Sequence, residues 1–164
     1  MMTHTELSVL EILTEDARTP VERIAIMTGK TSEEIAETIH RLEEQKIILK
    51  YPAMINWEKV DVEQVEAMIE VRVTPQRGEG FEAIAEQIYR FDEVSSVYLM
   101  SGGYDLLVNM KARTMRQLAL FVAEKLSTIE HVISTATHFV LRKYKDQGVL
   151  MDESTEDLRL KVTP

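Results

Sequence analysis

Hydrophobic positions in residues 1–60 recur at the three- and four-residue spacing of amphipathic helices. Three times, a Thr is followed three positions later by a Glu. In this capping-box pattern, both side chains satisfy free backbone N–H groups at a helix N-terminus. The pairs are Thr3/Glu6, Thr19/Glu22 and Thr31/Glu34. Pro20 adds a residue suited to the first position of a helix. The pattern predicts three successive helices.

Residues 28–31 alone separate the second predicted helix from the third, and Gly29 lies among them. A short turn that contains Gly is typical of a helix-turn-helix. The third helix carries an apolar stripe of Ile35, Ile39 and Leu42, so one side is expected to pack and the other to face outward. The expected polar face comprises Glu33, Glu37, Thr38, His40 and Arg41.

The segment after the third helix, residues 47–51, is β-branched and aromatic until Pro52 interrupts it. It predicts a short edge strand or small wing. The polar stretch 56–64 follows as a linker, and the pattern then changes. We therefore predict a helical domain at 1–61, a second domain at 62–150 and an acidic tail at 151–164 without a predicted structure.

The second half alternates strand and helix periods, with a Gly-Gly hairpin between its middle strands. The predicted order is β-α-β-β-α-β, a ferredoxin-like α+β domain whose antiparallel sheet carries two helices on one face. Strands are expected at 68–73, 94–100, 106–110 and 132–144, and helices at 81–91 and 114–126. Apolar residues assigned to the other sheet face suggest dimerisation through that face. They are Met68, Val97, Leu99 and Val140.

Composition narrows the class of protein. Hydrophobic residues make up 45% and charged residues 29%, which is ordinary for a soluble globular chain. No apolar run is long enough to span a membrane and the N-terminus has no signal-peptide layout, so we expect a cytoplasmic protein. There is no Cys, which excludes disulfides and thiolate chemistry.

Charge is a difficulty for a DNA-binding interpretation. The chain has 19 Lys and Arg against 28 Asp and Glu, a net charge of −9. Residues 1–60 hold 7 basic and 11 acidic side chains, which gives −4. Since DNA-binding domains are usually basic, any DNA-binding face must be a local patch. In a helix-turn-helix this patch is the third helix, whose N-terminal residues enter the major groove. The candidates are Lys30, Thr31, Ser32, Thr38, His40 and Arg41.

The hairpin at 101–105 is the best candidate for small-molecule binding. Glycine N–H groups can cradle a carboxylate, and the Asp105 carboxylate can hold an ammonium group, so an amino acid would fit both. Alternatively, the glycines only make the turn and Asp105 only satisfies backbone donors. The candidate residues are Ser101, Gly102, Gly103, Tyr104 and Asp105.

We predict no catalytic residues, metal site or cofactor. The four histidines lack metal-ligand spacing, and no phosphate loop, serine elbow or carboxylate pair stands out.

Several separate segments together resemble the leucine-responsive regulatory protein/AsnC family of prokaryotic transcription regulators. In the first half these are Leu13-x-x-Asp16-x-Arg18, Met27-Thr28-Gly29, Arg41-Leu42-Glu43-Glu44-x-x-Ile47-Ile48 and Tyr51-x-Ala53-x-Ile55-Asn56. In the second half they are Gly102-Gly103-Tyr104-Asp105-Leu106-Leu107-Val108, and Thr135-x-Thr137-x-Phe139-Val140-Leu141 followed by Tyr144-Lys145. The resemblance covers about residues 5–148.

The resemblance implies a DNA-binding helical domain and a ligand-sensing ferredoxin-like domain. It implies double-stranded DNA and an amino acid or similar effector as partners, and homodimers that often form a tetramer of dimers. In the family the effector lies between subunits near the hairpin and the start of the last strand. This adds Ser134, Thr135, Ala136 and Thr137 as candidates.

The chain departs from the family on the third helix. The family commonly has Arg at the position of Thr38 and lacks the acidic pair Glu33 and Glu34. Two alternatives therefore stay open beside an amino-acid-responsive DNA-binding regulator. One is a sensor or scaffold of the same architecture that meets a protein instead of DNA. The other is an enzyme similar to the sirohaem decarboxylases that resemble this family.

Overall fold

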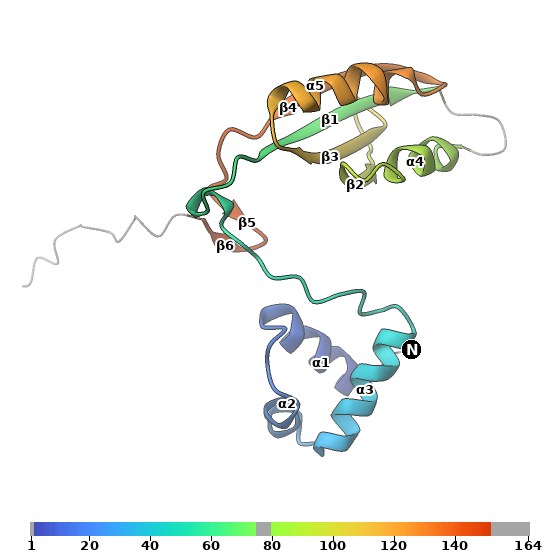
Figure 1. Ribbon diagram of the computed structural model, residues 1–164. Helices are drawn as coiled ribbons and strands as arrows, with labels where there is room; N and C mark the ends of the chain where they lie inside the picture. The colour runs from blue at the N-terminus through green and yellow to red at the C-terminus, as the bar shows by residue number, and fades with distance from the viewer. Residues whose placement is uncertain (1, 75–79, 152–164) are drawn as a thin grey trace, which may run out of the picture. The chain divides into compact units, whose positions relative to one another are not determined.

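The computed structural model describes residues 2–74 and 80–151, and it divides the chain into two compact units, 1–55 and 56–164 (Figure 1). Residues 56–61, predicted as part of the first domain, lie in the second unit. Asn56 Nδ2 donates to the carbonyl of Met151 (2.6 Å), which ties the start of the second unit to its C-terminal part. Apart from Met151, the predicted tail lies outside the described residues.

The first unit consists of α1 (His4–Glu15), α2 (Val21–Thr28) and α3 (Ser32–Glu44), as the pattern predicts. The three helices share one small core, around which Leu10, Ile39 and Ile48 pack partly buried. Its fully or nearly buried side chains are Val9, Ile24, Ala25, Ile35 and Leu42.

Two of the three predicted capping boxes are confirmed. Thr3 and Glu6 cap α1, and Thr31 and Glu34 cap α3, each with both hydrogen bonds formed. The second capping box was wrong: the N-cap of α2 is Pro20, without a side-chain bond. The Thr19 hydroxyl donates instead to the Asp16 carbonyl (2.8 Å), which closes the turn before the helix.

The predicted wing strand at 47–51 is not formed; in the described residues this segment pairs with no other strand. Its backbone serves α3 instead, since the N–H groups of Ile47 and Ile48 both donate to the carbonyl of Leu42. Tyr51 is held by its hydroxyl, which donates to Glu43 Oε1 (2.8 Å). Burial and this carboxylate raise the pKa of Tyr51 to about 12.

The second unit has the predicted β-α-β-β-α-β order, preceded by the 3₁₀ turn η1 (Trp57–Lys59). The sheet is antiparallel with strand order β2-β3-β1-β4, the ferredoxin-like topology. Its elements are β1 (Val65–Val73), α4 (Glu82–Tyr89), β2 (Val94–Leu99), β3 (Leu106–Ala112), α5 (Met115–Glu124), η2 (Leu126–Thr128) and β4 (Val132–Phe139).

Both helices cover the same sheet face, because side chains of α4, α5 and the strands form one buried cluster. Ile69 and Val108 lie at its centre with no exposed surface. The rings of Phe91 and Phe121 meet edge to face, with centroids 5.3 Å apart. The opposite face, termed the open face, carries the alternate residues of each strand.

Two residues predicted for the open face lie on the helix-covered side. Val97 and Leu99 are opposite Val108 and Leu106 in the register, and both of these partners are buried against the helices. The cause is a bulge between Val94 and Ser96, which shifts the alternation of β2 by one residue.

The last strand is shorter than predicted. It ends at Phe139, and a small hairpin of β5 (Lys145–Asp146) and β6 (Val149–Leu150) follows. Lys143 fastens this end to β1 through ion pairs with Glu66 (2.8 Å) and Asp146 (3.2 Å). These carboxylates raise the pKa of Lys143 against the opposing effect of burial.

Candidate functional site

The turn between α2 and α3 has the geometry of a helix-turn-helix. Gly29 ends α2 with φ = 67°, a left-handed conformation that glycine adopts without strain. The N–H groups of Gly29 and Lys30 both donate to the Ala25 carbonyl. Thr31 then caps α3 directly, so the turn presents the N-terminus of α3 immediately after α2 ends.

The structure brings most of the predicted DNA-contacting residues to the surface of α3 and its N-terminal turn. Lys30, Thr31, His40 and Arg41 are exposed, and Ser32 is half-buried. The hydroxyl of Thr31 accepts from the Glu34 N–H (3.2 Å), so it is already engaged in the cap.

Thr38 does not lie on the expected polar face. Its residue is only 7% exposed, and its hydroxyl donates to the Glu34 carbonyl (2.7 Å) within the helix. Thr38 packs on the same side as Ile35 and Leu42, so it is not placed to contact DNA. A threonine can be buried in this way because the bond to its own helix satisfies the hydroxyl.

The basic side chains at this face are neutralised within the unit. Arg41 Nη2 lies 2.9 Å from Glu6 Oε1, Lys30 Nζ lies 3.7 Å from Glu34, and His40 Nε2 lies 3.3 Å from Glu44. The Thr3 N–H, then Arg41, hold the pKa of Glu6 below its usual range. Each pair must loosen or share its cation before the cation can bind phosphate.

Two acidic side chains add to this charge. Glu33 and Glu37 are exposed on α3, and neither is ion-paired within the described residues. The outward face of α3 is therefore more acidic than basic, which agrees with the −4 charge of residues 1–60.

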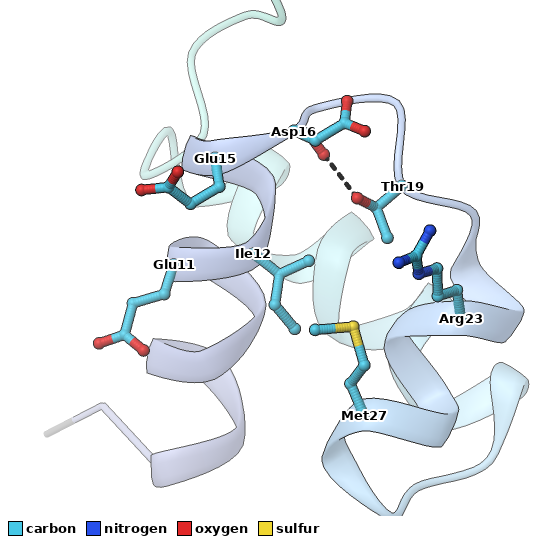
Figure 2. A pocket seen from close by; sticks show the side chains of 7 residues that line it. All are labelled: Glu11, Ile12, Glu15, Asp16, Thr19, Arg23 and Met27. Atoms are coloured by element: carbon cyan, nitrogen blue, oxygen red, sulfur yellow. Dashed lines mark hydrogen bonds between the residues drawn. The ribbon is translucent and has the colours of Figure 1, made fainter. Parts of the chain in front are cut away.

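A shallow hollow of about 310 Å³ lies between α1 and α2 in the same unit. Figure 2 shows Ile12 and Met27 meeting across it, while Glu11 and Glu15 point outward from α1. None of the predicted DNA-contacting residues lines it. The hollow is thus distinct from the α3 face.

The hairpin at 101–105 connects β2 to β3, and Asp105 closes it. The Met100 N–H donates to the Asp105 carbonyl (2.8 Å), and the Asp105 N–H donates to the Val71 carbonyl (3.1 Å). Asp105 Oδ2 accepts from the Val73 N–H (2.9 Å). One carboxylate oxygen therefore fastens β1, while Oδ1 accepts no hydrogen bond from the described residues. Ser101, Gly102 and Gly103 are exposed and Tyr104 is half-buried.

The four candidates on β4 do not share one surface. Thr135 and Thr137 are opposite Val71 and Ile69, on the helix-covered face, and Thr135 also meets the Ser127 hydroxyl (3.3 Å). Ser134 and Ala136 alternate with them on the open face and are exposed. Only Ser134 and Ala136 therefore share the open face.

The sequence analysis missed Arg72. It lies on the open face, where it is opposite Ser134 and one position beyond the pair Val71–Leu106, so the continued register places Asp105 on its other side. Arg72 is exposed and forms no ion pair with the described residues. The period-two alternation of residues 68–73 could have placed this guanidinium beside the hairpin.

The described residues contain no group of three metal-binding side chains. In the same part of the chain, no helix is long and apolar enough to cross a membrane.

Comparison with known proteins agrees with this architecture. Residues 66–150 match the family model described as the Lrp/AsnC ligand binding domain. An HTH-type transcriptional regulator of Bacillus subtilis, YugG, is 50% identical over 99% of each chain. A proline dehydrogenase transcriptional activator of Rhizobium radiobacter is 26% identical over 89% of this chain and 93% of its own.

Solved structures confirm the fold. A transcriptional regulator of Neisseria meningitidis in complex with L-Met matches with a TM-score of 0.71 and 22% identity, covering 89% of this chain and 94% of that one. AsnC of E. coli matches with a TM-score of 0.67 and 21% identity, over 87% and 94% of the two chains.

Proposed function

Since the chain belongs to the Lrp/AsnC family of helix-turn-helix transcriptional regulators, we propose that α3 contacts promoter DNA and that an amino acid or related metabolite acts as its effector. The effector binds in the second unit and changes DNA affinity or the oligomeric state. One observation carries the proposal: the α2–Gly29–α3 turn and a matched ligand-binding domain occur in the same chain. Because promoter DNA is its target, the protein works in the cytoplasm.

DNA binding by one α3 helix is weak. Lys30, His40 and Arg41 are paired with carboxylates, so a phosphate contact gains less than a free cation would supply. Linking several helical units in one oligomer compensates, since each further unit binds at a high effective concentration. Affinity therefore depends on assembly more than on any single helix.

The effector site combines Arg72, Asp105 and Ser134 with the exposed hairpin. Arg72 binds the carboxylate of an amino acid, and the free Oδ1 of Asp105 accepts from its ammonium group. The Neisseria meningitidis regulator, which was solved as a complex with L-Met, supports this ligand class. Ser101, Gly102 and Gly103 line the exposed side, and Ser134 offers a hydroxyl beside Arg72.

The assembly is a homodimer through the open sheet faces, and dimers join into a larger oligomer such as a tetramer of dimers. Met68 and Tyr98 leave 42% and 51% of their surfaces exposed on the open face, although both are large and apolar. Such a face on a sheet that is covered on one side only is typical of an association surface.

Regulation is favoured over the sirohaem-decarboxylase-like alternative because YugG and the Rhizobium radiobacter relative are transcriptional regulators. The alternative of a sensor without DNA affinity has one observation in its favour, the ion pairs on the α3 face.

Fluorescence anisotropy with a labelled promoter fragment of the protein's own gene separates these functions. We expect saturable binding that is tighter than binding to a scrambled fragment of equal length and that falls as salt rises. If the assembled oligomer shows no saturable binding at low salt, DNA recognition by this chain is excluded and the sensor alternative stands.

Replacing Arg72 with alanine is expected to weaken effector binding by about tenfold to a hundredfold, the effect of losing a hydrogen bond between charged groups. A thermal-shift screen of amino acids first identifies the ligand, which raises the melting temperature by binding only the folded state. Titration calorimetry then compares the variant with Arg116→Ala, an exposed arginine at the start of α5. Equal affinities in the two variants would remove Arg72 from the site.

A further inference from the structure

The open face has a definable centre. β3 and β1 are the two inner strands of the sheet, and Met68–Asn109 is the middle pair of the register that joins them. Ser96 on β2 and His138 on β4 continue this row to both edges. Asn109 and Met68 therefore occupy the middle of the open face.

Asn109 carries an unsatisfied polar atom at this central position. Its side-chain oxygen Oδ1 is buried and has no hydrogen-bond partner within the described part of the chain. A buried acceptor without a donor is unfavourable and uncommon in folded proteins. The amide also carries an N–H₂ donor, and rotation about χ2 exchanges donor and acceptor. Only a partner that offers both kinds of group satisfies the amide in either orientation.

The charges around this centre fit a second copy of the same face. Glu66 lies 3.9 Å from Lys111, and Glu70 lies 3.3 Å from His138. Acidic and basic groups thus alternate, so a face turned by half a revolution meets opposite charges. A twofold interface requires this kind of self-complementarity. A basic or an acidic partner would match only half of these groups.

We propose that the twofold axis of the homodimer passes beside Asn109, and that its amide pairs with Asn109 of the partner subunit. On the axis a residue meets its own copy, and two asparagine amides can exchange hydrogen bonds reciprocally. Packed sheets lie about 10 Å apart, a gap that two asparagine side chains meeting end to end can bridge. This inference rests on the dimer proposed above.

Such a pair determines register. A single buried Asn in a coiled coil selects one alignment because any shift leaves the amide unpaired. On this sheet, a slipped dimer would place Asn109 against an apolar side chain. Asn109 therefore selects one relative placement of the two subunits, and Met68 supplies apolar area beside it.

The test is a charge exchange at position 109 in the full chain. N109D and N109K each place like charges together on the axis, so each homodimer should dissociate at concentrations at least tenfold higher than the wild type. Mixing the two should restore a heterodimer at least tenfold tighter than either homodimer. Sedimentation measures the dissociation constants, and native mass spectrometry of differently tagged chains counts heterodimers.

Ala136 provides the matched control. It is exposed on the open face but lies on the edge strand β4. A136D and A136K should show no rescue on mixing, because off-axis residues do not meet their own copies. Circular dichroism melts should show that all four variants stay folded, which their surface positions favour.

The outcomes separate the two levels of the proposal. A wild-type chain that remains monomeric overturns the assembly proposed above. A wild-type dimer with unaffected N109D and N109K dimers places Asn109 outside the interface. Weakened dimers without rescue on mixing place Asn109 in the interface but away from the axis. Either of the last two results overturns the pairing and leaves the dimer standing.

Discussion

Replacing Ile35 with alanine is expected to unfold the helical unit and abolish DNA binding while the second unit stays folded. Ile35 is completely buried in the small core of α1, α2 and α3. Truncation of a buried isoleucine costs about 2–5 kcal/mol. A unit of this size is stabilised by only roughly 3–8 kcal/mol in total. The loss removes most of its stability.

Calorimetry should show the loss or downward shift of one transition, with the transition of the second unit unchanged. Effector binding by titration should be retained, because the ferredoxin-like core is separate from this one. Ile26→Ala is the matched control, since Ile26 is 83% exposed in the same unit and its truncation should change stability little. If the two alanine variants melt alike, the core assignment is incorrect.

The double variant Glu33→Lys/Glu37→Lys is expected to bind DNA about tenfold to a hundredfold more tightly at low salt. Both carboxylates are exposed on α3 and repel phosphate, whereas two lysines would contact it. Each new phosphate contact steepens the dependence of log affinity on log salt by about 0.9. Anisotropy titrations at several salt concentrations measure both quantities.

Glu11→Lys/Glu15→Lys provides the control for total charge. It changes the unit by the same number of charges, but both residues lie on α1 beside the hollow in Figure 2. A smaller gain is expected there, with little change in the salt slope. Equal gains in the two double variants would show that α3 is not the DNA-contacting helix.

The sequence predicted the elements well where local chemistry decides them. Thr31 caps α3 because its hydroxyl and the Glu34 carboxylate need only backbone groups within one turn. Thr19 has the same spacing to Glu22, but its hydroxyl found a nearer acceptor in the preceding turn. A capping pattern therefore predicts a helix start only where no tight turn competes.

Features that depend on distant partners could not be predicted in this way. Residues 47–51 have the composition of a strand, yet no strand lies beside them in the described chain. The bulge in β2 reversed the faces of Val97 and Leu99, and no sequence pattern reports a bulge. Thr38 was misplaced because residue polarity, rather than helical position, decided its assignment.

The candidate site shows the same division. The hairpin and Asp105 could be predicted because glycines and a carboxylate carry their own geometry. The order of residues along β4 could not reveal that Thr135 and Ser134 lie on different faces of the sheet until the register was known. Arg72 became visible only when β1, the hairpin and β4 were seen side by side.

The hydrogen bond from Asn56 to Met151 limits the reach of the protein on DNA. Ile48 still packs on the helical core, and Asn56 is already fastened in the second unit, so only residues 49–55 form the connector. Seven residues span at most about 25 Å when fully extended. This leash is shorter than the roughly 34 Å of one DNA turn. The spacing of operator half-sites that one dimer can tolerate is correspondingly narrow.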